Sequence, residues 1–249
     1  MALDGYILCA TPRSGSTLLG GLLAATGQAG DPHSFFRRED IAEWAAHWGV
    51  AQGDAGTPTA ERAYLAAAIA AGRAGTPLFG LRLMAESLPE LIALLDRLHP
   101  GLPSDRARLE AGFGRLAYLH LTRADPLAQA ISRVLAQQTG LWHRAPDGSE
   151  IERTAPPRLP VYDHAAINAE LARLTRDAAQ WHHWFAREGI TPLTLSYEEL
   201  ASDPPATLAR VCQALGLAPP PAGTVRPRTA RLSDAVNREW AARFRAEAG

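Results

Sequence analysis

The stretch that decides the fold is residues 6–27, which read YILCATPRSGSTLLGGLLAATG. Its first five residues form a short apolar run rich in strand formers. A helical pattern begins after residue 17 and closes at Gly27. A polar loop, TPRSGST, joins the two. A strand, a polar loop and a helix in this order are typical of phosphate-binding α/β folds, because the loop amides and the positive helix end point at one spot.

The residue types in this loop suit an anionic ligand. Arg13 supplies a fork-shaped cation that matches phosphate oxygens. The residues after it, which would add backbone amides and three hydroxyls, are Ser14, Gly15, Ser16 and Thr17. A doubly charged phosphosulfate fits this set better than a neutral ligand. The alternative is a turn that caps a helix and binds nothing.

Other known phosphate loops fit this segment less well. The pattern G-x-x-x-x-G-K-[ST] is absent, and no G-x-G-x-x-G follows a strand. A cysteine-phosphatase loop needs Arg six residues after its Cys, but Gly15 stands six residues after Cys9.

The rest of the chain alternates strand and helix patterns. Further strands are predicted at 78–84, 116–121 and 190–195. Helices are predicted to begin near Pro58, at a capping box formed by Ser87 and Glu90, and after Asp125, Asp163 and Asp203. This alternation predicts one α/β domain over residues 1–249, with a mostly parallel sheet covered by helices on both faces. Residues 140–162 are predicted to be a loop or lid, and 218–249 a basic arm.

Composition excludes several classes of protein. The formal net charge is −1, which predicts no attraction to nucleic acid or anionic membranes. All 25 basic residues other than His are Arg, so neither a Schiff base nor a P-loop lysine is available. The two cysteines are interpreted as buried free thiols, and no His/Cys cluster has the spacing of a metal site. No signal peptide or transmembrane segment is recognised, which predicts a cytoplasmic protein.

The loop resembles the 5′-phosphosulfate loop of PAPS-dependent sulfotransferases, where PAPS is 3′-phosphoadenosine 5′-phosphosulfate. The similarity is greatest to the bacterial trehalose 2-sulfotransferase family. It rests on RSGST at 13–17, ATGQAG at 25–30 and PHSFF at 32–36, in that order. A weaker match is the strand at 80–84, where Arg82 stands in a position that is usually Lys. The resemblance implies a P-loop-NTPase-like sulfotransferase fold and PAP as a product.

A second set of matches implies a 3′-phosphate site. Arg123 at the end of a predicted strand and Ser132 on the next helix are similar to the Arg and Ser that hold this phosphate in the family. Asp125 is interpreted as a helix cap. Arg231, nine residues before Trp240, is similar to an Arg of the family's C-terminal arm. The alternatives are an ordinary helix serine and a solvated helix face.

The resemblance breaks at the general base. The family position for a catalytic Glu is Ser34 here, and serine is a poor base at neutral pH. Either the base has moved to His33 or Asp31, or the acceptor differs from that of the family; histidine suits the role because it titrates near neutral pH. Trp44 and Trp48, together with Trp142, are either core residues or the wall of an acceptor cleft.

These observations predict a sulfotransferase that moves a sulfuryl group from PAPS to a hydroxyl of a carbohydrate, glycolipid or other small molecule without a metal. Two alternatives stay open. One is a small-molecule kinase of the P-loop class, which would need Mg²⁺ and ATP. The other is a non-catalytic protein that binds PAP or another nucleotide. A homodimer is compatible with each of them.

Overall fold

The computed structural model describes residues 2–50, 57–221, 223–229 and 235–247. Its centre is a four-stranded sheet in the order β2-β1-β3-β6, with every pair parallel. The strands are β1 (Gly5–Ala10), β2 (Phe79–Met84), β3 (Leu116–Thr122) and β6 (Leu193–Ser196). The α/β class and the parallel sheet predicted from the sequence are confirmed.

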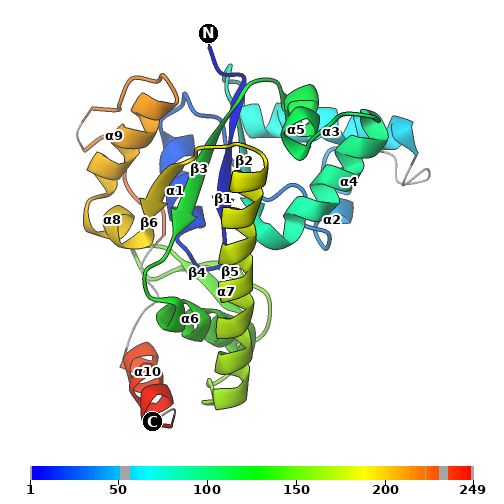
Figure 1. Ribbon diagram of the computed structural model, residues 1–249. Helices are drawn as coiled ribbons and strands as arrows, with labels where there is room; N and C mark the ends of the chain where they lie inside the picture. Colours follow the sequence, from blue (N-terminus) through cyan, green and yellow to red (C-terminus); the bar gives the residue numbers. More distant parts are fainter. Residues whose placement is uncertain (1, 51–56, 222, 230–234, 248–249) are drawn as a thin grey trace.

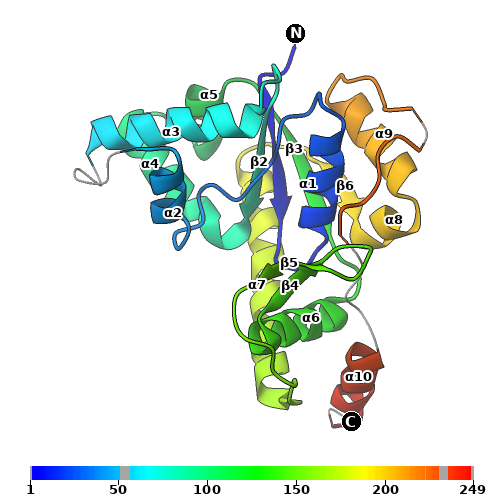
Figure 2. The same ribbon diagram turned by 180° about the vertical axis from the view of Figure 1, so that it is seen from behind.

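Strand β1 is buried along its whole length because both sheet faces are covered. Ile7 and Cys9 point into a core shared with α3 (Pro58–Arg73), α4 (Leu88–Leu98), α5 (Asp105–Phe113) and α7 (His164–Arg187). Tyr6 and Leu8 point into the opposite core, with α1 (Ser16–Ala25), α8 (Tyr197–Ser202) and α9 (Pro204–Ala214). Figures 1 and 2 show these two helical layers on either side of the sheet.

A third cluster lies beyond the carboxyl ends of the strands. Helix α10 (Ala235–Glu247) buries Trp240 and Phe244 against α6 (Pro126–Thr139) and the first half of α7. In Figures 1 and 2 this cluster sits below the sheet, next to a small hairpin formed by β4 (Leu141–Arg144) and β5 (Glu150–Arg153). Because parallel strands end at the same edge, the loop after β1 faces α6 and the hairpin.

The hairpin corrects the prediction of a loop or lid over 140–162. Strands β4 (Leu141–Arg144) and β5 (Glu150–Arg153) pair antiparallel with irregular register. The connection is built on Asp147 and Gly148: the Asp147 carboxylate accepts from the Ser149 amide at 2.9 Å, and Gly148 has φ 89°. An Asp-Gly pair in a short connection suits a hairpin turn.

Most predicted helix starts are confirmed by their caps. The side chains of Thr57, Asp125, Asp163 and Asp203 each accept a hydrogen bond from an amide in the first turn of the following helix. The capping box at Ser87 is wrong. Ser87 has φ −95° and ψ −11°, outside the extended conformation of a side-chain cap, because a 3₁₀ turn η1 (Ala85–Ser87) precedes α4. Trp44 and Trp48 are four residues apart, a spacing that suits one helix face, and their segment forms α2 (Ile41–His47) with Trp48 as its C-cap.

Cys9 and Cys212 are both buried free thiols, as predicted. Across the described ranges, no helix combines the length and apolar character needed to cross a bilayer. Within the same ranges, no three His, Cys, Asp or Glu side chains are grouped as metal ligands.

Candidate active site

The loop between β1 and α1 is shaped by two residues in the left-handed region. Arg13 has φ 63° and Gly15 has φ 90°. A Cβ at Gly15 would lie 2.6 Å from Cδ2 of Tyr197, so glycine is needed for both backbone conformation and space. Alternating right- and left-handed residues turn successive amides toward one concave spot, which is a common anion site.

Hydroxyls and helix amides converge at this spot. Helix α1 begins at Ser16, and the first amides of a helix have no partners within it. The Ser14 side chain is fully buried, and its hydroxyl has no hydrogen-bond partner. A buried hydroxyl without a partner is costly, so a ligand oxygen here would stabilise the loop.

Arg13 points away from the loop toward α6 and the hairpin. Its Nε donates to Ser132 Oγ at 3.1 Å, and its Nη1 donates to the Trp142 carbonyl at 2.7 Å. Burial, followed by repulsion from Arg123, lowers the pKa of Arg13 to about 10. The guanidinium remains charged at neutral pH, and both of these hydrogen bonds end on neutral oxygens.

Arg123 reaches the same loop from the end of β3. Its Nη1 donates to the Arg13 carbonyl at 3.1 Å, and its guanidinium lies 4.7 Å from the centre of the Tyr197 ring. Gln129 on α6 holds the loop from below by donating to Thr11 Oγ1 at 2.8 Å and to the Pro12 carbonyl at 2.6 Å. The two residues predicted for the 3′-phosphate, Arg123 and Ser132, are thus brought together around Arg13.

Arg82 on β2 is the third cation of the site. Its Nε donates to Ser34 Oγ at 3.0 Å, and its Nη1 donates to Thr17 Oγ1 at 2.7 Å. Burial lowers the pKa of Arg82. The Thr17 hydroxyl is also 3.1 Å from Nε2 of His143 on the hairpin.

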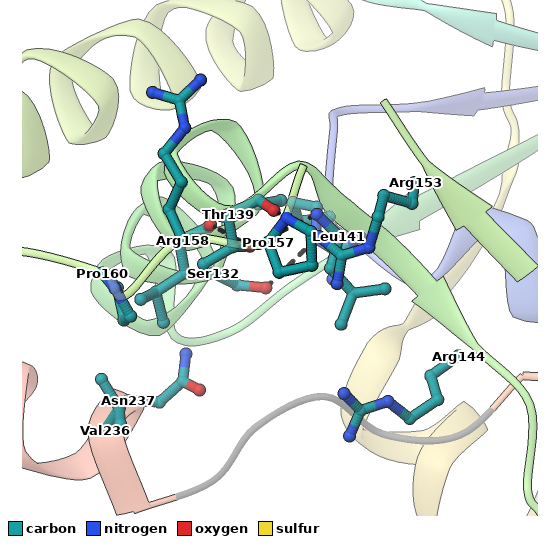
Figure 3. A pocket seen from close by; sticks show the side chains of 13 residues that line it. Ser132, Thr139, Leu141, Arg144, Arg153, Pro157, Arg158, Pro160, Val236 and Asn237 are labelled. Atoms are coloured by element: carbon teal, nitrogen blue, oxygen red, sulfur yellow. Dashed lines mark hydrogen bonds between the residues drawn. The ribbon is translucent and has the colours of Figure 1, made fainter. Parts of the chain in front are cut away.

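A cavity of about 370 Å³ opens beside Arg13 and Ser132 (Figure 3). Figure 3 shows Ser132 on α6 and Asn237 on α10 at this cavity. Other basic residues that line it come from the hairpin and the segment after it: Arg144, Arg153 and Arg158. Arg153 is paired with Glu150. Arg231, the third predicted phosphate ligand, lies outside the described residues.

A family model described as Stf0 sulphotransferase matches residues 5–247. This chain belongs to the Stf0 sulphotransferase family. It is 33% identical to a trehalose 2-sulfotransferase of Mycobacterium tuberculosis, over 99% of this chain and 96% of the relative. A trehalose 2-sulfotransferase of Mycolicibacterium smegmatis is 29% identical, over 98% and 95%. The solved sulfotransferase domain of the Synechococcus PCC 7002 olefin synthase has a TM-score of 0.39 at 18% identity, and the match covers 98% of this chain and 88% of that domain.

As an Stf0 sulphotransferase, the chain is an enzyme of sulfuryl transfer.

The side chains of the predicted base candidates, His33 and Asp31, have different contact partners from the side chain of Ser34. His33 Nε2 lies 3.2 Å from Asp31 Oδ1, and this hydrogen bond lowers the pKa of Asp31. The His33 ring lies 5.8 Å from Trp44, whereas Ser34 contacts Arg82. The role of His33 and Asp31 as bases stays a prediction.

The tryptophans proposed as an acceptor wall do not form one group. Trp44 and Trp48 are stacked with ring centres 5.2 Å apart, and both pack against the core beside Phe35. Trp142 lies on the hairpin, where its Nε1 donates to Thr154 Oγ1 at 3.0 Å. Only one wall of an acceptor cleft could therefore come from the stacked pair.

Sequence reasoning about this Stf0 sulphotransferase missed three residues that complete the site. Tyr197 covers Gly15 and contacts Arg123, a role that its position just after a predicted strand does not indicate. Gln129 and His143 carried no signal of their own, because one lies in a helical pattern and the other in a segment read as loop.

Proposed function

We propose that this sulfotransferase uses PAPS as donor and a carbohydrate hydroxyl as acceptor. One observation carries the donor assignment. Arg82 donates to Thr17 in the first turn of α1, and the Arg13 guanidinium donates to Ser132 and to the Trp142 carbonyl beside the same loop. Within the part of the chain that the structure describes, neither Arg13 nor Arg82 is within ion-pair distance of a carboxylate, so an anionic ligand would offset the desolvation of these two cations.

The residues present fit such a donor. When bound, PAPS supplies an activated sulfuryl group whose leaving group is the nucleotide 5′-phosphate. The unpartnered Ser14 hydroxyl and the first amides of α1 could donate hydrogen bonds to the 5′-phosphosulfate in the loop. Ser132 and Arg123 would hold the 3′-phosphate, and the adjoining cavity of about 370 Å³ offers room for part of the nucleotide.

The chain's own groups account for transition-state stabilisation. Negative charge grows on the leaving phosphate as the sulfuryl group departs, and loop amides with two nearby guanidiniums oppose that charge. Arg82 donates to Thr17 in the first turn of α1, and Arg13 donates to Ser132 on α6, next to the loop. No step in this scheme calls for a metal.

The acceptor class rests on the relatives. Both are trehalose 2-sulfotransferases, and each matches this chain over nearly its full length. We infer a neutral sugar or glycolipid, and the stacked Trp44 and Trp48 offer an aromatic edge next to His33. Trehalose is only one of the candidates, because Ser34 stands where the family resemblance places the Glu that would activate this acceptor.

The test is sulfuryl transfer from radiolabelled PAPS to a panel of neutral sugars that includes trehalose, with product identified by mass spectrometry. We expect labelled sugar from the wild-type protein, and a rate of labelling about 10²-fold lower from Arg82→Leu. A parallel reaction with γ-labelled ATP and Mg²⁺ tests the kinase alternative. Tight PAP binding without transfer to any sugar would instead support the non-catalytic alternative.

A further inference from the structure

The hairpin β4–β5 contacts the loop between β1 and α1, and the start of α1, through two successive residues. The carbonyl of Trp142 accepts from Arg13 at 2.7 Å, and Nε2 of His143 lies 3.1 Å from Thr17 Oγ1. The His143 side chain is 22% exposed, so it is reachable from solvent while lying against the loop. An imidazole therefore sits beside the predicted sulfuryl position, on an element that the sequence did not flag.

In one of the two neutral tautomers of His143, the Nε2 lone pair faces Thr17. Arg82 donates to the Thr17 oxygen at 2.7 Å, so the single proton of the Thr17 hydroxyl can point to His143 Nε2. This arrangement requires the tautomer with its proton on Nδ1. When donor oxygens engage the Thr17 hydroxyl, the Nε2 lone pair is released at the loop.

The charged groups that face His143 come from three elements. Arg13 on the loop and Arg82 on β2 repel a protonated imidazole, while Glu152 on β5 lies 3.5 Å from Nε2. Burial, followed by these two arginines, lowers the pKa of His143 to about 4. The imidazole is thus neutral at physiological pH, as a proton acceptor must be.

We propose that His143 is the general base that accepts the proton of the acceptor hydroxyl, and that Glu152 stabilises the imidazolium that forms. This inference rests on the proposed sulfuryl transfer. His33 is less well placed, because its Nε2 already faces Asp31 and its ring lies beside Trp44. Ser34 contacts Arg82, and a serine hydroxyl is not basic enough for this role.

The step balances within the site. The acceptor oxygen forms a bond to sulfur while its proton moves to His143 Nε2. The bond between sulfur and the 5′-phosphate oxygen breaks, and its electron pair stays on the phosphate of PAP. The proton then passes from the imidazolium to solvent. A donor polyanion offsets the field of Arg13 and Arg82, so donor binding raises the pKa of His143 toward the working pH.

The experiment compares His143→Ala and His33→Ala with a surface control, His183→Ala, which lies exposed on α7. Each variant is assayed with saturating PAPS and trehalose, and in parallel for PAPS hydrolysis, in which water is the acceptor. PAP affinity by calorimetry shows whether each variant is folded. We expect His143→Ala to lose about 10²–10⁴-fold in turnover while binding PAP, and to lose more than His33→Ala.

The reverse ranking, with His33→Ala the more damaged, would overturn the proposal and return the role to His33. Equal turnover of His143→Ala and His183→Ala would overturn it as well. If wild-type protein neither binds PAP nor consumes PAPS, the proposed function fails instead. An independent NMR titration of the His143 ring should show its pKa rising when PAP is added, and an unchanged value would contradict the proposal.

Discussion

Arg13 offers the sharpest test of how the loop works, because its guanidinium contacts α6 and the hairpin while its backbone lies in the left-handed region. Its guanidinium donates to Ser132 Oγ at 3.1 Å and to the Trp142 carbonyl at 2.7 Å. Its backbone has φ 63°, which only glycine adopts without strain. The variants Arg13→Ala and Arg13→Gly both remove the guanidinium, but only glycine also relieves the backbone.

The expected losses differ between binding and turnover. A single charge-assisted contact to PAP is worth about 1.5–3 kcal/mol, or roughly 10- to 150-fold in affinity. Removing a preorganised donor from a developing charge costs about 2.7–4 kcal/mol, or about 10²–10³ in kcat. Because the leaving phosphate gains charge only in the transition state, kcat should fall further than PAP affinity.

The assay measures kcat at saturating PAPS and the Kd of PAP by calorimetry for both variants. Similar kcat values in Arg13→Ala and Arg13→Gly would show that the guanidinium, not the backbone conformation, carries the effect. A normal kcat with weakened PAPS binding would show that Arg13 does not stabilise the transition state and only anchors PAPS in the ground state.

Other predictions concern stability and loop shape. Burial, followed by repulsion from His182, lowers the pKa of His120 from 6.5 to about 4, so stability that is complete above about pH 6.5 should fall as pH drops toward about 4. The loss should reach about 3 kcal/mol and be smaller in His120→Gln, as measured by urea unfolding across this pH range. Gly15→Ala places a Cβ 2.6 Å from Tyr197 at φ 90°, and should cost about 1–3 kcal/mol of stability and weaken PAP, by thermal unfolding and calorimetry. Unchanged PAP affinity in that variant would mean that the loop is not the phosphosulfate site.

The central strands could be predicted because a buried strand is marked by a local run of apolar residues. The runs at β1, β2 and β3 are apolar on both faces apart from Arg82, His120 and the terminal Thr122, as is typical of buried parallel strands. The prediction for β6 began three residues early, at Ile190, which is buried but precedes Pro192 and joins no strand. Pairing order depends on contacts between distant segments, so β1 lying between β2 and β3 could not be read from local pattern.

The candidate site was predictable where a residue type has few other uses. A Gly-containing polar loop between strand and helix, and an Arg at a strand end, both marked positions that the fold brings together. Ser132 was assigned through resemblance, and the structure places it against Arg13. His143 could not be found this way, because its contact with Thr17 spans 126 positions and depends on how the hairpin folds back.

We propose that this loop and the adjoining pocket bind a nucleotide carrying a 3′-phosphate. The most direct measurement is the affinity of the wild-type protein for PAP and for AMP, repeated with Ser132→Ala and Arg123→Ala. We predict that PAP binds about 10- to 150-fold more tightly than AMP, and that both variants lose affinity for PAP far more than for AMP. Equal binding of PAP and AMP by the wild-type protein, or equal weakening of both in the variants, would contradict the claim.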